Sequence, residues 1–561
     1  MTSAPTAEPP ARRKGPTGWS ILEGQTEEAP QVQPFKAIDP SRGEPLPIGY
    51  HSATPEQVDR ACRAAWVALH EVRRRSPEHR AGLLEAIAAN ILELGPSLIN
   101  VAAQETGLPE QRLLAERERT TGTLLRFAEV VREGSWVRAA IDRADPERQP
   151  RPKPDVRRVL RSLGPVAVFG ASNFPLAYST MGTDAASALA AGCPVIIKGH
   201  PLHPGTGELV AWAVVDALQA TGFPQGMFAF LHAGGQREKA IGEELVKHPF
   251  VRAAGFTGSQ AGGTALADLA RARPDPIPFF AEMGSTNPAF LLPSAAASQG
   301  EAVAHLLTES ITAFAGQQCT RPGLLFMIDN EDASKVLNEL TRRFNTLPDQ
   351  VMLAPRIRDA YLRRVLGWAG VEGVELKTDP KRLATPRAKD GSAPKGPVSG
   401  AAALLRTTSS TFLSNDTLHD EVFGPAVLVV LCPDERAMAN AAASIQGTLT
   451  ASMFFAADDR NTARRLVSVL EHRAGRIVFN GVPTGVEVCE AMVHGGPFPA
   501  TNRPDTTAVG PLALERWCRP VAYQNGPGAL LPPELRDDNP AGIRRRVDGK
   551  WRSGPLSDDE A

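Results

Sequence analysis

The chain has 561 residues, a formal net charge of −1 at pH 7, 42% hydrophobic residues and 22% charged residues. This composition is typical of a globular protein, and the length corresponds to about three to four domains' worth of mass. The near-zero charge gives no electrostatic case for nucleic acid or an anionic membrane, and no apolar run reaches the ~18 residues of a membrane-spanning helix. The first residues lead into no apolar signal segment, so we expect neither secretion nor a membrane partner.

The six cysteines are scattered and show no paired or clustered spacing. This distribution argues against a disulfide framework or a structural zinc site, and it favours a reducing compartment, the cytoplasm. All of them except Cys319 are interpreted as small buried hydrophobic residues. These five are Cys62, Cys193, Cys432, Cys489 and Cys518.

Both ends of the chain are rich in proline and poor in large apolar residues. We therefore expect residues 1–34 and residues 526–561 to be flexible extensions. Closer to the middle, residues 54–132 show a helical pattern that begins at Thr54, a predicted N-cap followed by Gln57.

Residues 158–282 alternate between strand and helix patterns. Strands are predicted over 166–169, 195–197, 227–231, 251–256 and 277–281, and helices over 184–191, 207–220 and 239–247. Repeated units of this length require a parallel sheet with helices on both faces, so the predicted fold class is α/β with a doubly wound, dinucleotide-type domain. A second α/β block runs over 283–493, and a Pro- and Arg-rich stretch at 146–157 interrupts the first block.

Three short motifs carry the chemistry of the chain. They are Gly316-Gln317-Gln318-Cys319-Thr320, Phe280-Ala281-Glu282-Met283-Gly284-Ser285 and Ala171-Ser172-Asn173-Phe174-Pro175. A thiolate can form a covalent adduct, a carboxylate can activate the water that releases it, and an amide can stabilise an oxyanion. In this combination and order, the motifs resemble those of the aldehyde dehydrogenase superfamily, over roughly residues 35–525.

The resemblance implies a domain plan and an assembly. Residues 35–145 and 165–282 are expected to form the dinucleotide-binding domain, and residues 283–493 the catalytic domain. Residues 146–164 and 494–525 are expected to form a small oligomerisation arm, which implies a homodimer or a homotetramer.

The resemblance also implies a reaction. Cys319 attacks an aldehyde to give a thiohemiacetal, hydride leaves to a nicotinamide, and a thioester remains. Asn173 and the backbone N–H of Cys319 stabilise the oxyanion, and Glu282 activates the hydrolytic water. Relatives that transfer the acyl group to coenzyme A generally lack this glutamate, so hydrolysis is favoured. Because the thiol must be partly ionised, we expect positive potential or a helix N-terminus near it.

Cofactor contacts follow from the same resemblance. Gly258 and Ser259 end a strand and open a helix, where backbone N–H groups suit a pyrophosphate. Lys198 is expected to reach the adenine ribose, and the motif beginning at Glu421 is expected to hold the nicotinamide ribose. The complete set is Phe169, Lys198, Gly258, Ser259, Glu421 and Phe423.

Several positions depart from the general family pattern. Pro201 stands three residues after Lys198, where many NAD-dependent members carry an acidic residue that binds the ribose hydroxyls. With no carboxylate there to repel a 2′-phosphate, NADP is slightly favoured over NAD, and Arg237 is a candidate partner for that phosphate. Ser285 replaces the second glycine after Glu282. Ser172 replaces the usual aromatic residue before Asn173.

These departures, together with the segments 191–194, 200–206 and 494–501, resemble the α-ketoglutarate semialdehyde dehydrogenases, which oxidise 2,5-dioxopentanoate to 2-oxoglutarate. NADP-dependent fatty aldehyde dehydrogenases share many of these segments, so a medium- or long-chain aldehyde is the alternative small-molecule substrate. A non-catalytic scaffold on the same fold is the remote alternative. The Pro- and Gly-rich surroundings of three histidines predict loop positions, and no metal site is expected. They are His200, His203 and His494.

Overall fold

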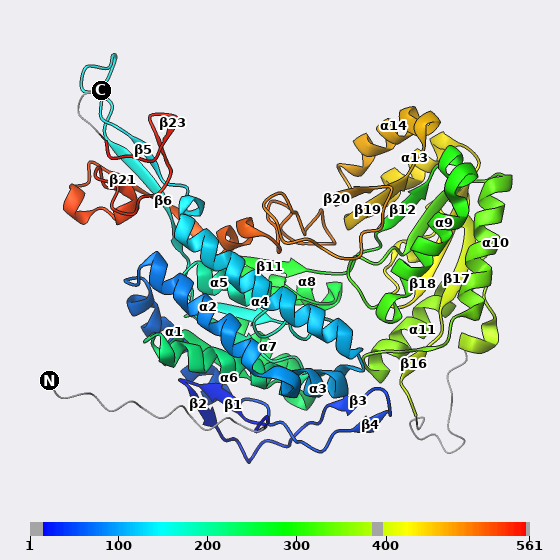
Figure 1. The fold of residues 1–561 in the computed structure, drawn as a ribbon, viewed down its shortest axis with the longest axis horizontal. Coiled ribbons are helices and arrows are strands. Elements are labelled where there is room, and N and C mark those ends of the chain that lie inside the picture. The colour runs from blue at the N-terminus through cyan, green and yellow to red at the C-terminus, as the bar shows by residue number, and fades with distance from the viewer. Residues whose placement is uncertain (1–14, 384–395, 557–561) are drawn as a thin grey trace.

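The computed structural model of the chain describes residues 15–383 and 396–556. Its strands form two seven-stranded sheets, one five-stranded sheet and two short pairs. Figure 1 shows the two large sheets in adjacent lobes with helices packed on them, and the five-stranded sheet projecting from the body as an arm. This architecture confirms the predicted α/β fold class.

The first sheet has the strand order β11-β10-β7-β8-β9-β1-β2, and its five strands from β11 to β9 are parallel. These are β7 (Val166–Phe169), β8 (Val195–Lys198), β9 (Phe228–Leu231), β10 (Ala253–Thr257) and β11 (Phe279–Glu282). The connecting helices are α5 (Thr183–Ala190), α6 (Pro204–Ala220), α7 (Glu238–Lys247) and α8 (Gln260–Arg271). The chain runs outward from β7 to β9 and then returns to β10, and such a reversal is where doubly wound sheets bind their ligands.

Four helices precede this sheet: α1 (Pro55–Val72), α2 (Pro77–Glu93), α3 (Gly95–Thr106) and α4 (Glu110–Glu133). The predicted start of α1 is confirmed, because Thr54 and Gln57 form a reciprocal capping box. In the described part of the chain, no single helix is long and apolar enough to cross a membrane. The pair α2 and α3 passes that test on length and composition, but the two helices are bent by 75° at their junction.

Residues 15–34 are not the flexible extension predicted from their composition. They contain β1 (Ser20–Leu22) and β2 (Gln25–Glu27), and β1 pairs antiparallel with β9 at the edge of the first sheet. Ile21 is fully buried there. The carboxylate of Glu208 on α6 fixes the chain just before β1, since it accepts hydrogen bonds from the backbone N–H groups of Thr17 (2.6 Å) and Gly18 (2.9 Å). Residues 1–14 of the predicted extension lie outside the described residues.

The second sheet has the order β15-β17-β18-β13-β12-β19-β20, parallel from β17 to β20. Its strands are β12 (Pro288–Leu291), β13 (Leu324–Ile328), β15 (Glu375–Leu376), β17 (Ala403–Thr408), β18 (Ala426–Cys432), β19 (Thr448–Phe454) and β20 (Ala474–Phe479). Its helices are α9 (Pro293–Thr312), α10 (Glu331–Thr346), α11 (Pro355–Ala369), α12 (Ser409–Leu413), α13 (Glu435–Ser444) and α14 (Arg460–Leu470). The two short pairs are β3 (Ile38–Asp39) with β4 (Glu44–Pro45) and β14 (Gln350–Val351) with β16 (Ser399–Gly400).

The arm sheet has the order β21-β6-β5-β22-β23. Its strands are β5 (Ala140–Asp142), β6 (Val156–Ser162), β21 (Cys518–Gln524), β22 (Arg545–Val547) and β23 (Lys550–Arg552). Of the predicted arm segment 494–525, only residues 518–524 lie in this sheet. The earlier part runs instead along the first sheet, where Thr501 forms a backbone bridge with Glu282.

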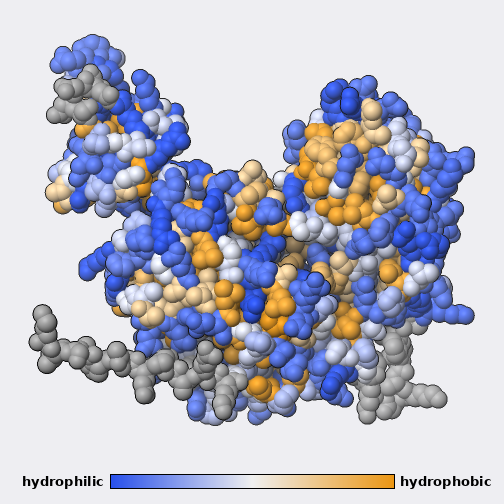
Figure 2. All heavy atoms as spheres, in the orientation of Figure 1, coloured by the Kyte–Doolittle hydropathy of each residue, from blue (hydrophilic) through white to orange (hydrophobic). Residues whose placement is uncertain are grey.

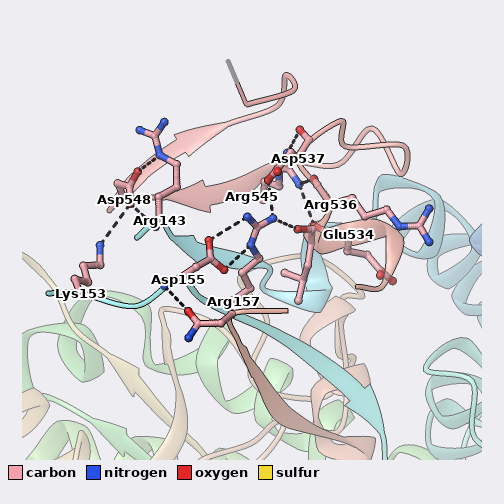
Figure 3. Close-up of polar contacts among 11 residues, drawn as sticks. Arg143, Lys153, Asp155, Arg157, Glu534, Arg536, Asp537, Arg545 and Asp548 are labelled. Atoms are coloured by element: carbon pink, nitrogen blue, oxygen red, sulfur yellow. Dashed lines mark hydrogen bonds and ion pairs between the residues drawn. The ribbon is translucent and has the colours of Figure 1, made fainter. Parts of the chain in front are cut away.

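Residues 526–556 are not the flexible tail predicted from their composition, because β22 and β23 complete the arm sheet. Figure 3 shows the polar contacts that fix them. Arg157 on β6 forms ion pairs with Asp155 (2.9 Å) and Asp537 (2.6 Å). The fully buried Arg545 donates to the carbonyl of Asp537 at 3.0 Å. A small apolar core under the arm adds Leu531, Leu535, Ile543 and Val547. Residues 557–561 of the predicted tail lie outside the described residues.

Candidate active site

The candidate site lies where opposite edges of the two large sheets meet. From the first sheet, Lys198 and Glu282 are the last residues of β8 and β11. From the second sheet, Cys319 precedes β13 and Glu421 precedes β18. Carboxyl ends of one sheet therefore face amino ends of the other, and the predicted catalytic residues converge between them.

The loop that carries Cys319 follows η4 (Ala313–Gly316) and has a tightly specified backbone. Phe314 and Ala315 adopt left-handed conformations with φ of 53° and 56°, and Gly316 follows with φ of 62°. A Cβ atom on Gly316 would clash with the backbone of Gly424, so only glycine fits at this contact. The contact joins the cysteine motif directly to the motif that begins at Glu421.

Asn287 holds the Cys319 loop against the second sheet. Its side-chain N–H₂ donates to the backbone carbonyls of Cys319 (2.6 Å) and Arg321 (2.9 Å). Its oxygen accepts from the backbone N–H of Thr450 at 3.2 Å, and the residue is buried with φ of 46°. The sequence did not single out Asn287, because an asparagine before a proline also fits an ordinary turn.

Asn173 reaches the same loop from the first sheet. Its side-chain N–H₂ donates to the carbonyl of Gln317 at 2.9 Å, two residues before Cys319. The structure therefore brings the predicted amide donor close to the loop of the predicted nucleophile, although Asn173 and Cys319 lie far apart in the sequence. An amide in this position can donate its second N–H toward an oxyanion formed on the sulfur-bound carbon.

Glu282 is buried at the end of β11, and its Oε2 atom has no hydrogen-bond partner among the described residues. Burial raises the pKa of Glu282 well above its ordinary value. Arg516 opposes that shift, and Asp184 adds to it. A carboxylate with a raised pKa is a stronger base than one in water, which suits a general base near neutral pH.

Burial has the largest effect on the ionisation of the Cys319 thiol. Burial raises its pKa to about 12, the carboxylates of Glu282 and Glu421 add to the shift, and Arg119 opposes it. Arg119 is the positive charge expected near the thiol, but burial and the two carboxylates outweigh its effect on the pKa. His494, on a loop as predicted, was given no role in the sequence analysis, yet its Nε2 lies 3.8 Å from the sulfur. Burial lowers the pKa of His494 to about 3, so the imidazole is neutral.

The predicted ribose contact, Lys198, is half-buried beside Phe169. A Cβ atom on Gly242 would lie 3.2 Å from the Phe169 ring and 3.8 Å from Cε of Lys198. Burial lowers the pKa of Lys198 to about 8, although the charge of Glu238 opposes that shift. A partly buried amine of this kind can bind the hydroxyls or a phosphate of a dinucleotide.

The turn after β10 fits the remaining anionic part of a dinucleotide. Ser259 caps α8 by accepting a hydrogen bond from the N–H of Gly262 at 3.3 Å. A Cβ atom on Gly258 would come within 2.7 Å of the Phe256 ring, so this turn has no room for a side chain. The helix N-terminus can therefore be approached closely by a pyrophosphate.

Glu421 and Phe423 lie together in the loop before β18, both half-buried. Burial raises the pKa of Glu421 to about 7, while the backbone N–H of Ser285 opposes the shift. A Cβ atom on Gly284 would clash with the Glu421 carboxylate, which explains why this glycine is kept. The departure at the next position is also explained, since the Ser285 hydroxyl bonds to Asn287 at 2.7 Å.

Other predicted or weighed positions lie elsewhere. Arg237 is bound to Glu244 at 3.1 Å and donates to the carbonyl of Ala53 at 2.8 Å, so its charge is already partnered. His200 and His203 stack with ring centroids 5.1 Å apart on the loop after β8.

A cavity of about 390 Å³ opens onto Cys319, within the size range of small-molecule sites. Its walls come from α4, from the loop after β7, from the Cys319 loop and from residues 484–486. They combine aromatic rings with two arginines. The residues that matter below are Arg112, Glu116, Arg119, Phe174, Tyr178 and Phe314.

Residues 27–497 match the aldehyde dehydrogenase family. The chain is 46% identical to alpha-ketoglutaric semialdehyde dehydrogenase 2 of Azospirillum brasilense, over 94% of this chain and 98% of the relative. It is 42% identical to alpha-ketoglutaric semialdehyde dehydrogenase of Acinetobacter baylyi, over 95% and 98%. A crystal structure of betaine aldehyde dehydrogenase from Staphylococcus aureus in complex with NAD+ superposes with a TM-score of 0.75 at 19% identity, covering 91% and 96%. That last likeness concerns the fold alone.

Proposed function

We propose that this chain, which belongs to the aldehyde dehydrogenase family, oxidises 2,5-dioxopentanoate to 2-oxoglutarate with NADP or NAD as hydride acceptor. The observation that carries the proposal is the match over nearly the whole chain to two relatives named for this semialdehyde. Two contacts around Cys319 support the chemistry: Asn173 binds the carbonyl of Gln317 in the same loop, and the charge of Glu282 acts on the thiol.

In the proposed reaction, Cys319 is the nucleophile. The Cys319 thiol gives its proton to water as the sulfur forms a bond to the aldehyde carbon, and the carbonyl oxygen becomes an oxyanion that Asn173 and the Cys319 backbone N–H stabilise. The nicotinamide, when bound, accepts the hydride that the same carbon loses. The Nε2 atom of His494 lies 3.8 Å from the sulfur, and His494 is proposed to orient the thiol.

Glu282 is the proposed base for the second half of the reaction. It takes a proton from water, the water oxygen attacks the thioester carbon, and the sulfur leaves as the carboxylic acid forms. The unpartnered Oε2 of Glu282 supports this role, because a buried carboxylate oxygen without a hydrogen bond can accept one from water.

We propose NADP as the slightly preferred cofactor. Pro201 offers no carboxylate against a 2′-phosphate, and Lys198 offers an amine. Arg237 remains a candidate phosphate contact only if it leaves Glu244, whereas Arg356 of α11 lies 3.6 Å from Glu238, near Lys198. The ratio of kcat/KM for NADP to that for NAD, measured in the wild type and in Arg356→Gln, tests both the preference and its source.

The assembly is proposed to be a homodimer or a homotetramer built through the arm. The edges of β21 and β20 are open in the single chain, and Phe479 at the end of β20 is 52% exposed. Figure 2 shows a hollow between the arm and the second lobe, with apolar residues on the side of that lobe facing it. Light scattering of the full chain tests this, and a monomer at micromolar concentration would contradict it.

The cytoplasm is the proposed compartment, in line with six cysteines that form no disulfide in the structure.

Initial rates of reduced-cofactor formation test the substrate. The wild type is expected to show a much higher kcat/KM with 2,5-dioxopentanoate than with dodecanal. A preference for dodecanal would instead favour the alternative, a fatty aldehyde dehydrogenase of the same mechanism. No turnover with either aldehyde, in a folded protein that binds NADP, would favour the scaffold alternative.

A further inference from the structure

We propose that Arg119 binds the carboxylate of the aldehyde substrate and so sets the preference of the cavity for anionic aldehydes. This inference rests on the function proposed above, since it assumes an ω-carboxylated substrate. It assigns to one side chain a specificity that the sequence, with its many arginines, could not place.

The helix α4 presents a charged face to the cavity. Arg112, Glu116 and Arg119 follow one another at spacings of four and three residues, and all three line the cavity that Cys319 also lines. Residues at these spacings lie on one face of a helix. The cavity wall therefore carries two cations and one anion within two turns.

Arg112 already has a counter-ion and lies against two aromatic rings. It forms an ion pair with Glu116, and its guanidinium lies 4.5 Å from the ring centroid of Phe174 and 4.9 Å from that of Phe314. Glu116 in turn accepts the backbone N–H of Leu176 at 2.8 Å. A substrate carboxylate near Arg112 would meet the charge of Glu116 as well, so the pair offers no net attraction.

Arg476, the third arginine near the sulfur, is committed in a different way. It donates to the carbonyls of Pro483 and Gly485, and so holds the loop that forms one wall of the cavity. Arg476 does not itself line the cavity. Its role is to shape the wall rather than to meet the substrate.

Of the two arginines that line the cavity, Arg112 has a counter-ion and Arg119 has none among the described residues. The guanidinium of Arg119 donates to the Tyr178 hydroxyl at 3.0 Å and lies 5.5 Å from the centroid of that ring. Across the described ranges, no carboxylate lies within ion-pair distance of it. Its charge acts on the reacting atom, since Arg119 is the charged side chain that opposes the raised pKa of Cys319. A guanidinium fork held at one corner by a neutral phenol can still bind a carboxylate with its other N–H groups.

The chemistry of the substrate fits this arrangement. In 2,5-dioxopentanoate the aldehyde carbon and the carboxylate carbon are separated by four bonds, about 5 Å in an extended chain. With the aldehyde at Cys319 and the carboxylate at Arg119, the methylene groups pass the aromatic wall of Phe174 and Tyr178. Glyoxylate, whose carboxylate is attached to the aldehyde carbon, has no methylene spacer between the two groups and is expected to be a poor substrate.

The test is the discrimination ratio, kcat/KM for 2,5-dioxopentanoate divided by kcat/KM for pentanal, measured within each variant. In Arg119→Gln this ratio is expected to fall about 10- to 100-fold, chiefly through KM for the anionic aldehyde. In Arg119→Glu the kcat/KM for the cationic 4-(trimethylammonio)butanal is expected to rise relative to pentanal. Because each ratio is internal to one protein, a partly misfolded variant does not change it.

A control and three outcomes decide the matter. Arg126 lies on the same helix, and Arg126→Gln, which removes surface ion pairs to Glu129 and Glu490, is expected to keep the wild-type ratio. If Arg119→Gln also keeps it, the anchor lies elsewhere while the proposed function stands. If Arg112→Gln collapses the ratio and Arg119→Gln does not, the two arginines were assigned in the wrong order. If the wild type itself shows no preference for the anionic aldehyde, both the inference and the proposed substrate fail.

Discussion

The two seven-stranded sheets build the site from opposite edges. In the first sheet Asn173 follows β7 and Glu282 ends β11. Both therefore lie at the carboxyl edge, where open α/β sheets place ligands. In the second sheet Cys319, Asn287 and Glu421 come before theirs. The general rule for parallel sheets therefore locates the cofactor half of this site and misses the half that carries the nucleophile.

The two edges are also held by different means. Glu282 is the last residue of β11, so the strand itself positions it, and Asn173 lies in the connection between β7 and α5. The second-sheet loops depend on side chains that bind the backbone. Besides Asn287, the buried Arg321 donates to the carbonyls of Pro322 (2.9 Å) and Val422 (2.7 Å), which ties the cysteine loop to the Glu421 loop. Catalytic precision at the amino edge thus rests on a few polar side chains.

The largest effect is expected from Cys319→Ala, which removes the chemistry of the amino edge. Dehydrogenase turnover should fall by on the order of 10⁴-fold or more, because no other group forms the covalent adduct. Steady-state rates measure this, with thermal unfolding to show that the fold is kept. Cys489→Ala, at a half-buried cysteine with no proposed role, is the matched control. Normal turnover in Cys319→Ala would sink the mechanism.

Glu282→Gln removes the proposed base at the carboxyl edge. The substitution should separate acylation of the cysteine from hydrolysis of the thioester. Steady-state turnover should fall about 10²- to 10⁴-fold, because water loses its base while the cysteine can still be acylated. Stopped-flow absorbance should then show a burst of reduced cofactor without steady turnover. If neither a burst nor a loss of rate is seen, another group is the base.

Asn287→Ala tests whether the amino edge depends on its side-chain clamps. Without the bonds to the carbonyls of Cys319 and Arg321, the sulfur should shift, and kcat should fall about 10- to 100-fold. The rate of iodoacetamide alkylation at Cys319 should change in parallel, which a distant structural effect would not require. A kcat within about twofold of the wild type would show that the loop is positioned without Asn287.

The smallest effect is expected on the pH dependence of the free energy of unfolding, through the buried carboxyl group of Glu282. Folding raises the pKa of Glu282, so the native state holds its proton to higher pH than the unfolded chain does. This contribution to stability is complete below the unfolded pKa and is lost as the pH rises through the folded pKa, by about 1.4 kcal/mol per pH unit between the two. Glu282→Gln should therefore gain thermal stability relative to the wild type as the pH rises. An equal pH dependence in both proteins would show that Glu282 ionises as it would in water.

The sequence predicted what short motifs and strand–helix alternation can carry. The parallel core of the first sheet follows from apolar runs of strand length, and Cys319 and Asn173 stand in motifs that the structure brings together. The chain ends were mistaken because proline content outweighed brief apolar segments such as Ile21 and Leu22, which are too short to show a period. The arginine at the cavity could not be placed, since the direction of Arg119 depends on how α4 packs.

The C-terminal hairpin of the arm has a consequence for how the chain behaves in a crowded solution. It covers the edge of β5, and it ends the sheet with a three-residue strand that carries Lys550 and Arg552. Short, positively charged edge strands resist pairing with the strands of other chains. The hairpin lies beyond residues 27–497, the part that matches the family. A chain cut before Arg545 would leave β5 open as a template, so we expect such a chain to aggregate more readily than the full one.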